Sequence, residues 1–227
     1  MSRKSRINDA RNAEATAQAE KQRRNRWIIL AVAAVAVVAL IIGAVALGGE
    51  KEPENIVPVA SHTVEIDIAG HGVITAELYD NIAPITVANF AKLANEGFYD
   101  GLTFHRIING FMMQGGCPNG DGLGGSGTNI KGEFTANGVY NPLLHERGVL
   151  SMARSSQPNS ASSQFFIMHQ NSPWLDGQYA AFGRVVSGME IVDAICAGTP
   201  VIDGNGTVLK ENQPVINTIR VVETAAE

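Results

Sequence analysis

Short runs of alternating apolar and polar residues recur from residue 62 to the end of the chain, and turn-forming residues bound most of them. The first two, HTVEIDIAG and GVITAELYD, meet at a Gly-His-Gly centre, which is typical of a β-hairpin. Six more runs follow: LTFHRIING, FMMQGG, GVLSMAR, QFFIMHQ, YAAFGRVVSG and PVINTIRVVET. Many short strands with little helix between them predict a closed or nearly closed antiparallel β-barrel.

Two segments have a helical period instead. In APITVANFAKLANEGFYDG, Val87, Phe90 and Ala94 fall on one helical face. Pro84 suits the first turn of this helix, and Gly97 suits its C-terminal end. The segment GMEIVDAICAGT is predicted to form the second helix.

The N-terminal part of the chain is of a different kind. Residues 1–26 contain eight Lys or Arg and three acidic residues, a net charge of +5, and no charged residue occurs from Trp27 to Gly49. About 20 apolar residues in a helix span the hydrocarbon core of a bilayer, and this run has no polar stripe. We therefore expect a basic cytoplasmic tail (1–26), a transmembrane signal anchor (27–48), a linker (49–60) and an extracytoplasmic domain (61–227), oriented by the positive-inside rule.

A cleaved signal peptide is the alternative to this anchor, because Ala44-Val45-Ala46 fits a small-x-small cleavage site. Cleavage near Ala46 would release a secreted protein. The long basic leader and long apolar run favour the uncleaved anchor. From Glu50 onward, nine Lys or Arg and nineteen acidic residues give a net charge of −10, which argues against a nucleic-acid partner.

Several common site motifs fail on their context. GDGLGG (120–125) and GLGGSG (122–127) fit G-x-G-x-x-G but lie in a Gly-rich loop, 117–132, that does not lead into a helix. The five histidines form no metal-ligand spacing, and no G-x-S-x-G occurs, so we expect no metal, cofactor or serine nucleophile. Cys117 and Cys196 could pair in an exported domain, but free buried thiols are the favoured interpretation.

The stretch FHRIINGFMMQGG (104–116) carries one arginine among large apolar residues. The nearest acidic residues in sequence are Asp100 and Asp121. In a regular strand Phe104, Arg106 and Ile108 would share one face. Either the guanidinium faces water, or an apolar wall holds it where a ligand binds.

The motifs FHRIINGFMMQGG, GVLSMAR, SSQFFIMH and WLDGQYAAFGRV resemble those of cyclophilin-type peptidyl-prolyl cis-trans isomerases, in the same order, over roughly residues 60–223. The resemblance implies a mainly β fold: a closed eight-stranded antiparallel barrel with two capping helices and a peptide groove on its outer wall. With the segment above, the predicted fold is this barrel preceded by a single transmembrane helix.

The resemblance also implies roles for individual residues. Arg106 corresponds to the catalytic arginine, and the other positions form the peptide-binding groove. The proline pocket would be lined by Phe111, Met112, Phe166 and Leu175. Further groove positions are Gln114, Gly122, Ala153, Arg154, Gln164, Trp174 and Tyr179, of which Trp174 is associated with cyclosporin binding.

Some positions depart from the family pattern. Arg154 stands where the family often has asparagine, Tyr179 where histidine is common, and Asn109 where proline is usual. The loop SSQPNSASS is one residue longer than usual. These differences bear on peptide preference and on cyclosporin-like inhibitors more than on the reaction.

The expected function is rotation of X–Pro bonds in unfolded or folding exported proteins by a membrane-tethered isomerase. This reaction needs no cofactor. The alternative is a membrane-tethered module that binds proline-containing peptides without turnover.

Overall fold

The computed structural model describes residues 56–222. The predicted tail (1–26) and anchor (27–48) lie outside these residues, as does most of the predicted linker (49–60). Among the residues described, no helix is long and apolar enough to cross a membrane.

The eight predicted strands are all present and form one antiparallel sheet. The first hairpin pairs His62 with Leu78 at its open end and Ile68 with Gly72 at its turn. The strands are β1 His62–Ile68, β2 Gly72–Leu78, β3 Phe104–Ile108, β4 Met112–Gly115, β5 Val149–Met152, β6 Phe165–Met168, β7 Ala181–Ser187 and β8 Ile216–Val222.

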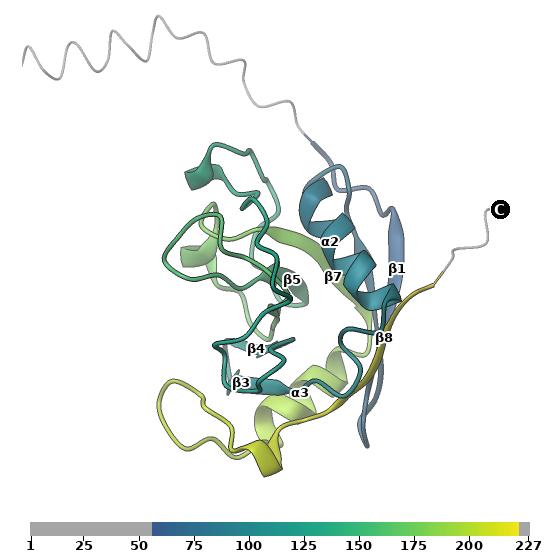
Figure 1. Ribbon diagram of the computed structural model, residues 1–227, viewed down its shortest axis with the longest axis vertical. Coiled ribbons are helices and arrows are strands. Elements are labelled where there is room, and N and C mark those ends of the chain that lie inside the picture. The colour runs from purple at the N-terminus through teal and green to yellow at the C-terminus, as the bar shows by residue number, and fades with distance from the viewer. Residues whose placement is uncertain (1–55, 223–227) are drawn as a thin grey trace, which may run out of the picture. The chain divides into compact units, whose positions relative to one another are not determined.

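The sheet runs in the order β3-β4-β6-β5-β7-β2-β1-β8 and curls so that its two ends approach each other (Figure 1). The segments just before its edge strands meet at a bridge between Thr103 and Val215. Two further backbone bonds join them, Phe104 N to Pro214 O at 3.0 Å and Ile216 N to Leu102 O at 2.8 Å. The sheet is therefore a curled one whose ends touch at one point, rather than the continuous closed ladder of the prediction.

Both predicted helices form. α2 (Pro84–Asn95) begins at Pro84 and ends just before Gly97, and α3 spans Met189–Gly198. The two helices lie toward different ends of the curled sheet (Figure 1). Phe90 of α2 packs its ring 5.1–5.2 Å from the rings of Tyr99, Phe165 and Phe182, so an aromatic cluster fills the space between α2 and the sheet.

A β-bulge interrupts β3 at His105. Phe104 pairs with Gly115 and Arg106 with Gln114, which leaves His105 without an opposite residue. The extra residue shifts the alternation of faces: Phe104 and Ile107 are buried in the core, whereas Arg106 is partly exposed. The expectation that Phe104 and Arg106 share a face was therefore wrong.

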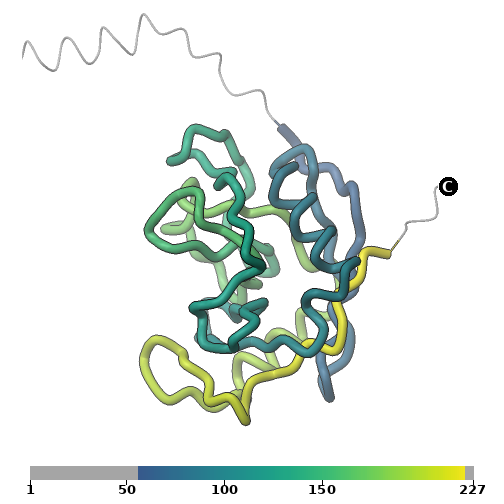
Figure 2. Tube along the Cα trace, viewed as in Figure 1, coloured from purple at the N-terminus to yellow at the C-terminus, as the bar shows by residue number. Residues whose placement is uncertain are grey.

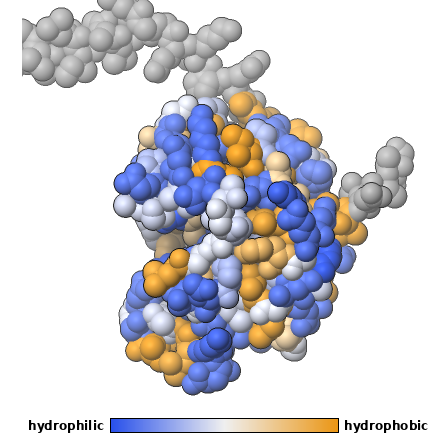
Figure 3. Space-filling view, viewed as in Figure 1, coloured by the Kyte–Doolittle hydropathy of each residue, from blue (hydrophilic) through white to orange (hydrophobic). Residues whose placement is uncertain are grey.

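A loop between α3 and β8, residues 199–209, covers the outer edge of β3. Ile107 N donates to Gly206 O at 2.8 Å, and Val208 N donates to His105 O at 3.0 Å. Gly206 has a φ of +83°, and a Cβ built there would lie only 2.3 Å from Ile107 O, so only glycine allows this approach. The loop projects at the lower left of the tube view, where the surface also shows apolar side chains (Figures 2 and 3).

The Gly-rich segment 117–132 is a loop, as predicted, with no helix after its glycine motifs. Cys117 and Cys196 are both buried and unpaired, which agrees with the favoured interpretation. Burial raises the pKa of the Cys196 thiol to about 12, so this group stays protonated and behaves as a small apolar side chain.

Candidate active site

The guanidinium of Arg106 stands on the outer face of β3, held by two neighbours. Its Nε donates to the backbone O of Asn205 at 2.8 Å, and its Nη1 donates to Gln114 Oε1 at 3.3 Å. Its Cζ lies 6.0 Å from the ring centroid of Phe111. Partial burial lowers the pKa of Arg106, and Tyr179 raises it; the group remains a cation at physiological pH. Nη2 makes no hydrogen bond within residues 56–222 and is available to a ligand.

A cavity of about 180 Å³ opens beside this guanidinium. Phe111, Met112, Phe166 and Leu175 give it apolar walls, and Arg106 provides the charge at its edge. Met112 and Phe166 are almost fully buried, so the walls belong to the core. The cavity is small and largely apolar, and two cations border it, Arg106 and Arg154.

Strand register explains how residues distant in sequence meet here. Arg106 on β3 pairs with Gln114 on β4, Gln114 pairs with Phe166 on β6, and Phe166 pairs with Ser151 on β5. Residues directly opposite on adjacent strands are close neighbours. A single row across four strands therefore sets the cation, the amide and the aromatic wall side by side.

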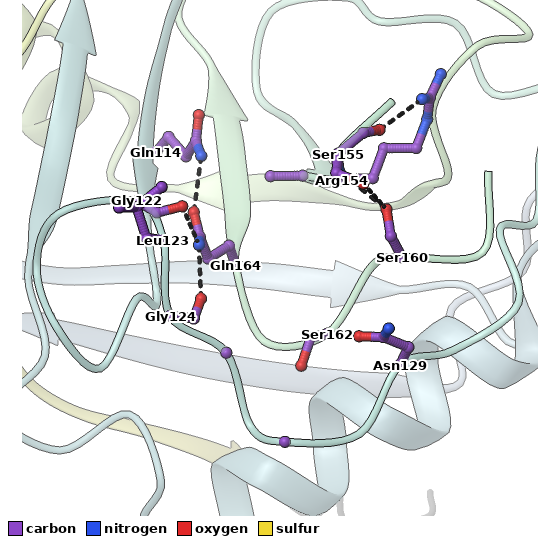
Figure 4. A pocket seen from close by; sticks show the side chains of 13 residues that line it. Gln114, Gly122, Leu123, Gly124, Asn129, Arg154, Ser155, Ser160, Ser162 and Gln164 are labelled. Atoms are coloured by element: carbon purple, nitrogen blue, oxygen red, sulfur yellow. Dashed lines mark hydrogen bonds between the residues drawn. The ribbon is translucent and has the colours of Figure 1, made fainter. Parts of the chain in front are cut away.

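A second, polar cavity of about 410 Å³ adjoins the first, and Gln114, Ala153 and Arg154 line both. Gln114 Nε2 donates to Gln164 Oε1 at 2.9 Å. Gln164 Nε2 donates in turn to Gly122 O at 2.9 Å and Gly124 O at 2.7 Å (Figure 4). This chain of amides fixes the Gly-rich loop beside the strands and forms one wall of the polar cavity.

The guanidinium of Arg154 packs against two aromatic rings and donates hydrogen bonds to a backbone carbonyl. Its Cζ lies 4.6 Å from the Tyr179 ring centroid and 5.0 Å from that of Phe134. Its Nη2 and Nε donate to Gln178 O at 2.9 and 3.1 Å. In Figure 4 the guanidinium extends away from Gln164 and Gly124, so Arg154 supports Tyr179 at the edge of the polar cavity that it helps to line.

Behind the apolar cavity lies a buried hydrogen-bonded chain. The ring of His145 stacks near Phe166, with centroids 6.1 Å apart. Its Nδ1 lies 3.0 Å from Asp176 Oδ1, and its Nε2 lies 3.0 Å from Ser151 Oγ. Burial lowers the pKa of His145 against the opposing effect of Asp176. In the neutral ring, Nδ1–H donates to the carboxylate and Nε2 accepts from the serine hydroxyl.

The structure brings most of the predicted site residues together. Nine of the twelve line the 180 Å³ cavity, and Gln164 and Gly122 line the polar one. Trp174 lines neither: its side chain is 65% exposed and lies beside Phe111, with ring centroids 5.8 Å apart. The roles of these twelve residues in binding and catalysis remain predictions.

Two residues that support the site were not found from the sequence. Asn205 holds Arg106 through its backbone carbonyl, which carries no side-chain signature, from 99 positions away. His145 was noted only as a histidine outside any metal spacing. Its pairing with Ser151 and Asp176 depends on tertiary contacts that no local sequence pattern predicts.

Comparisons with known proteins agree with this geometry. The model of the family described as "Cyclophilin type peptidyl-prolyl cis-trans isomerase/CLD" matches residues 63–225. The chain thus belongs to the cyclophilin-type peptidyl-prolyl cis-trans isomerases, enzymes that interconvert the cis and trans forms of X–Pro bonds.

Individual relatives have the same enzymatic description. Peptidyl-prolyl cis-trans isomerase B of Bacillus subtilis is 51% identical over 138 residues, which cover 61% of this chain and 87% of the relative. A probable peptidyl-prolyl cis-trans isomerase of Brucella suis is 42% identical over 190 residues, covering 78% and 90%.

A solved structure shows the same fold. The Cryptosporidium parvum cyclophilin type peptidyl-prolyl cis-trans isomerase, crystallised in the presence of the dipeptide Ala-Pro, matches with a TM-score of 0.63 and 32% identity. The match covers 71% of this chain and 99% of that chain.

Proposed function

We propose that the 180 Å³ cavity receives the proline ring of a peptide and that Arg106 is the catalytic residue. The observation that carries this proposal is the fixed cation at the edge of an apolar cavity of this size. Nη2, which has no partner among the described residues, would donate to the prolyl nitrogen. Phe111, Met112, Phe166 and Leu175 would enclose the ring.

This arrangement favours the twisted state of the bond. In the planar amide the nitrogen lone pair is delocalised, and rotation costs ~18–20 kcal/mol. Twisting returns the lone pair to the nitrogen, which then accepts a hydrogen bond. The interaction is therefore much stronger in the transition state than in the ground state, as catalysis requires.

The free energies of these interactions are large enough to account for the rate enhancement. Uncatalysed X–Pro isomerisation takes tens to hundreds of seconds, so a rate about 10⁴–10⁵ higher needs about 5.5–7 kcal/mol. A charge-assisted hydrogen bond supplies ~1.5–3 kcal/mol. The remainder falls to fixed orientation and to the strengthening of that bond in a cavity with little water.

We further propose that the enzyme acts on unfolded or folding exported proteins while residues 27–48 hold it in the cytoplasmic membrane. The support is the charge-free apolar run after a basic leader and the acidic composition of residues 50–227. Slow prolyl isomerisation limits the folding of many chains, so an isomerase placed where exported chains emerge would speed their folding. Secretion after cleavage near Ala46 is the alternative.

Cyclosporin-like compounds are proposed inhibitors. The support is Trp174, which the family resemblance associates with cyclosporin binding and whose exposed ring stands beside Phe111 at the rim of the cavity. Tyr179 in place of the usual histidine is expected to change the affinity.

The test is an isomerisation assay on a proline tetrapeptide with the full-length chain in mild detergent, beside its Arg106→Ala and Arg106→Lys variants. We expect activity in the parent, a severe loss in Arg106→Ala and only partial rescue by lysine, which lacks the planar fork. Equal rates for parent and Arg106→Ala would refute the mechanism. Peptide binding without turnover in the parent would instead establish the non-catalytic module.

The orientation is tested separately by adding protease to spheroplasts. Digestion of the C-terminal domain is expected. Protection of that domain until the membrane is dissolved would overturn the proposed topology.

A further inference from the structure

The apolar walls of the 180 Å³ cavity differ in how the fold holds them. Met112 and Phe166 lie in strands and are almost fully buried, so the sheet fixes both. Phe111 instead lies in the turn between β3 and β4, beside Gly110, which is exposed. Surface connections are more mobile than the strands that they join. The position of the Phe111 ring therefore depends on what holds this turn.

His169, the residue that follows β6, bonds to the main chain on both sides of Phe111. Its backbone N donates to Phe111 O at 2.9 Å. Its ring Nδ1 accepts a hydrogen bond from Gly110 N, also at 2.9 Å. His169 is only 7% exposed, so little water competes for these bonds. One residue thus holds the turn immediately before and immediately after the aromatic wall.

A carboxylate on α3 favours the tautomer that this arrangement needs. Asp193 Oδ1 lies 3.1 Å from His169 Nε2. Arg147 donates to both oxygens of Asp193 at 2.7 Å, and these bonds lower the pKa of Asp193. A negative oxygen beside Nε2 favours the ring proton on that nitrogen, which leaves Nδ1 as the acceptor for Gly110.

Arg147 also holds His169 directly. Its Nη1 donates to His169 O at 2.9 Å, and its backbone N donates to Asn171 Oδ1 at 2.8 Å. The imidazole is therefore tied to α3 on one side and to the β3–β4 turn on the other. His169 itself does not line the 180 Å³ cavity, so any effect that it has on the reaction passes through Phe111.

We propose that His169, in the tautomer that Asp193 favours, is a positioning residue that sets the Phe111 wall in place before a proline ring enters the cavity. A wall that is already ordered costs less on binding than one that the ligand must order. The Phe111 ring centroid also lies 6.0 Å from Arg106 Cζ, so a displaced ring would alter the surroundings of the cation as well. This inference rests on the proposed function of that cavity.

The test uses two substitutions that each keep one half of the polar contacts of the ring. His169→Asn places Oδ1 where Nδ1 lies and keeps an acceptor for Gly110. His169→Gln reaches toward Asp193 and gives up that acceptor. Both variants lose the imidazole ring, so a general packing defect should affect them equally, and urea denaturation would measure it.

The first measurement is amide hydrogen exchange of Gly110 in the full-length chain in mild detergent. Because Gly110 is exposed, its bond to His169 is the source of any protection. We expect His169→Asn to keep the protection and His169→Gln to lose it by about three- to tenfold, the factor that one hydrogen bond supplies.

The second measurement is steady-state kinetics on a proline tetrapeptide. His169→Gln should lower kcat/KM by about three- to tenfold, mostly through a higher KM, because the wall contacts the ring in the planar and twisted states alike. His169→Asn should recover most of this loss.

A substitution at the surface leaves the buried ring unchanged. Asp193→Asn removes the charge that favours the tautomer and should lower kcat/KM by about two- to threefold. Asp100→Asn is the matched control, because it disrupts another bidentate ion pair, with Arg220, that lies outside the cavities described above. It should keep the parent kinetics.

The outcomes separate this inference from the proposed function. No turnover by the parent would defeat the proposed function, and exchange at Gly110 would still decide whether His169 holds the turn. With an active parent, equal kcat/KM in His169→Asn and His169→Gln would overturn the positioning role. Parent kinetics in Asp193→Asn, or unchanged protection of Gly110 in His169→Gln, would overturn it as well.

Discussion

The Nε of Arg106 donates a 2.8 Å hydrogen bond to the backbone carbonyl of Asn205, on a loop 99 positions further along the chain. That loop is itself braced by Asp203, whose Oδ1 accepts from the backbone N of Asn205 and of Thr207, both at 3.0 Å. The orientation of the proposed catalytic group therefore depends on an acidic residue that touches neither the guanidinium nor the apolar cavity.

Replacing Asp203 with alanine should reduce kcat/KM by roughly three- to tenfold, because a loosened Asn205 carbonyl no longer fixes the guanidinium, and small misplacements are costly in catalysis. Most of the loss should appear in kcat rather than KM. Steady-state kinetics on a proline tetrapeptide would measure it. A variant with parent kinetics, despite faster amide exchange in residues 203–207, would show that the brace is irrelevant to catalysis.

Phe111 and Trp174 should differ sharply although their rings are neighbours. Phe111→Ala removes a wall of the 180 Å³ cavity and should lower kcat/KM by roughly 10- to 100-fold, from the ~1.5–3 kcal/mol of a buried aromatic contact. Trp174→Ala removes an exposed ring outside the cavity and should change kcat/KM on a short peptide by less than about threefold. Comparable losses in both would mean that the peptide contacts the rim rather than the cavity.

His145→Phe should lower the free energy of unfolding by about 2–4 kcal/mol. The variant keeps a ring against Phe166 but leaves the fully buried Ser151 hydroxyl without its partner. Urea denaturation would give the value, and Ser151→Ala should restore part of it in the double variant. An additive double-mutant cycle would contradict the coupling of these two residues.

Stability should depend on pH through His105. Its folded pKa is about 4, and its unfolded pKa is about 6.5. The unfolded state therefore binds the proton first, and stability falls as pH decreases from 6.5 to 4, by about 3 kcal/mol in total. His145, whose pKa is also lowered, adds to this slope.

His105→Gln should remove the part of the pH dependence of stability that comes from His105 and leave the part that comes from His145. Denaturant unfolding at pH 7 and pH 4.5 for the parent and variant would measure the difference. Identical slopes would show that His105 titrates normally and is hydrated in the fold.

Much of the architecture was predictable because it is locally encoded. Pro84 and Gly97 bracket α2, and alternating apolar residues mark β1 and β2, because burial on one face repeats at the period of the element itself. The site residues were identified from motifs that occur in the same order as in the family. The strand register of the structure then places Arg106, Gln114 and Phe166 in one row.

The features that the sequence did not reveal depend on tertiary geometry. The bulge at His105 adds one residue to β3 opposite β4, and no local pattern distinguishes it from regular alternation, so Phe104 and Arg106 were predicted to share one face. The brace from Asn205 uses main-chain atoms, which are the same in every residue. The chain through His145, Ser151 and Asp176 likewise joins positions that are separated in sequence.

The loop 199–209 also has a protective consequence. By bonding to the main chain of His105 and Ile107, it occupies polar groups of a terminal strand that would otherwise be open to pairing with another chain. Because the loop occupies that border, extended segments of other chains are kept from adding themselves to the sheet there.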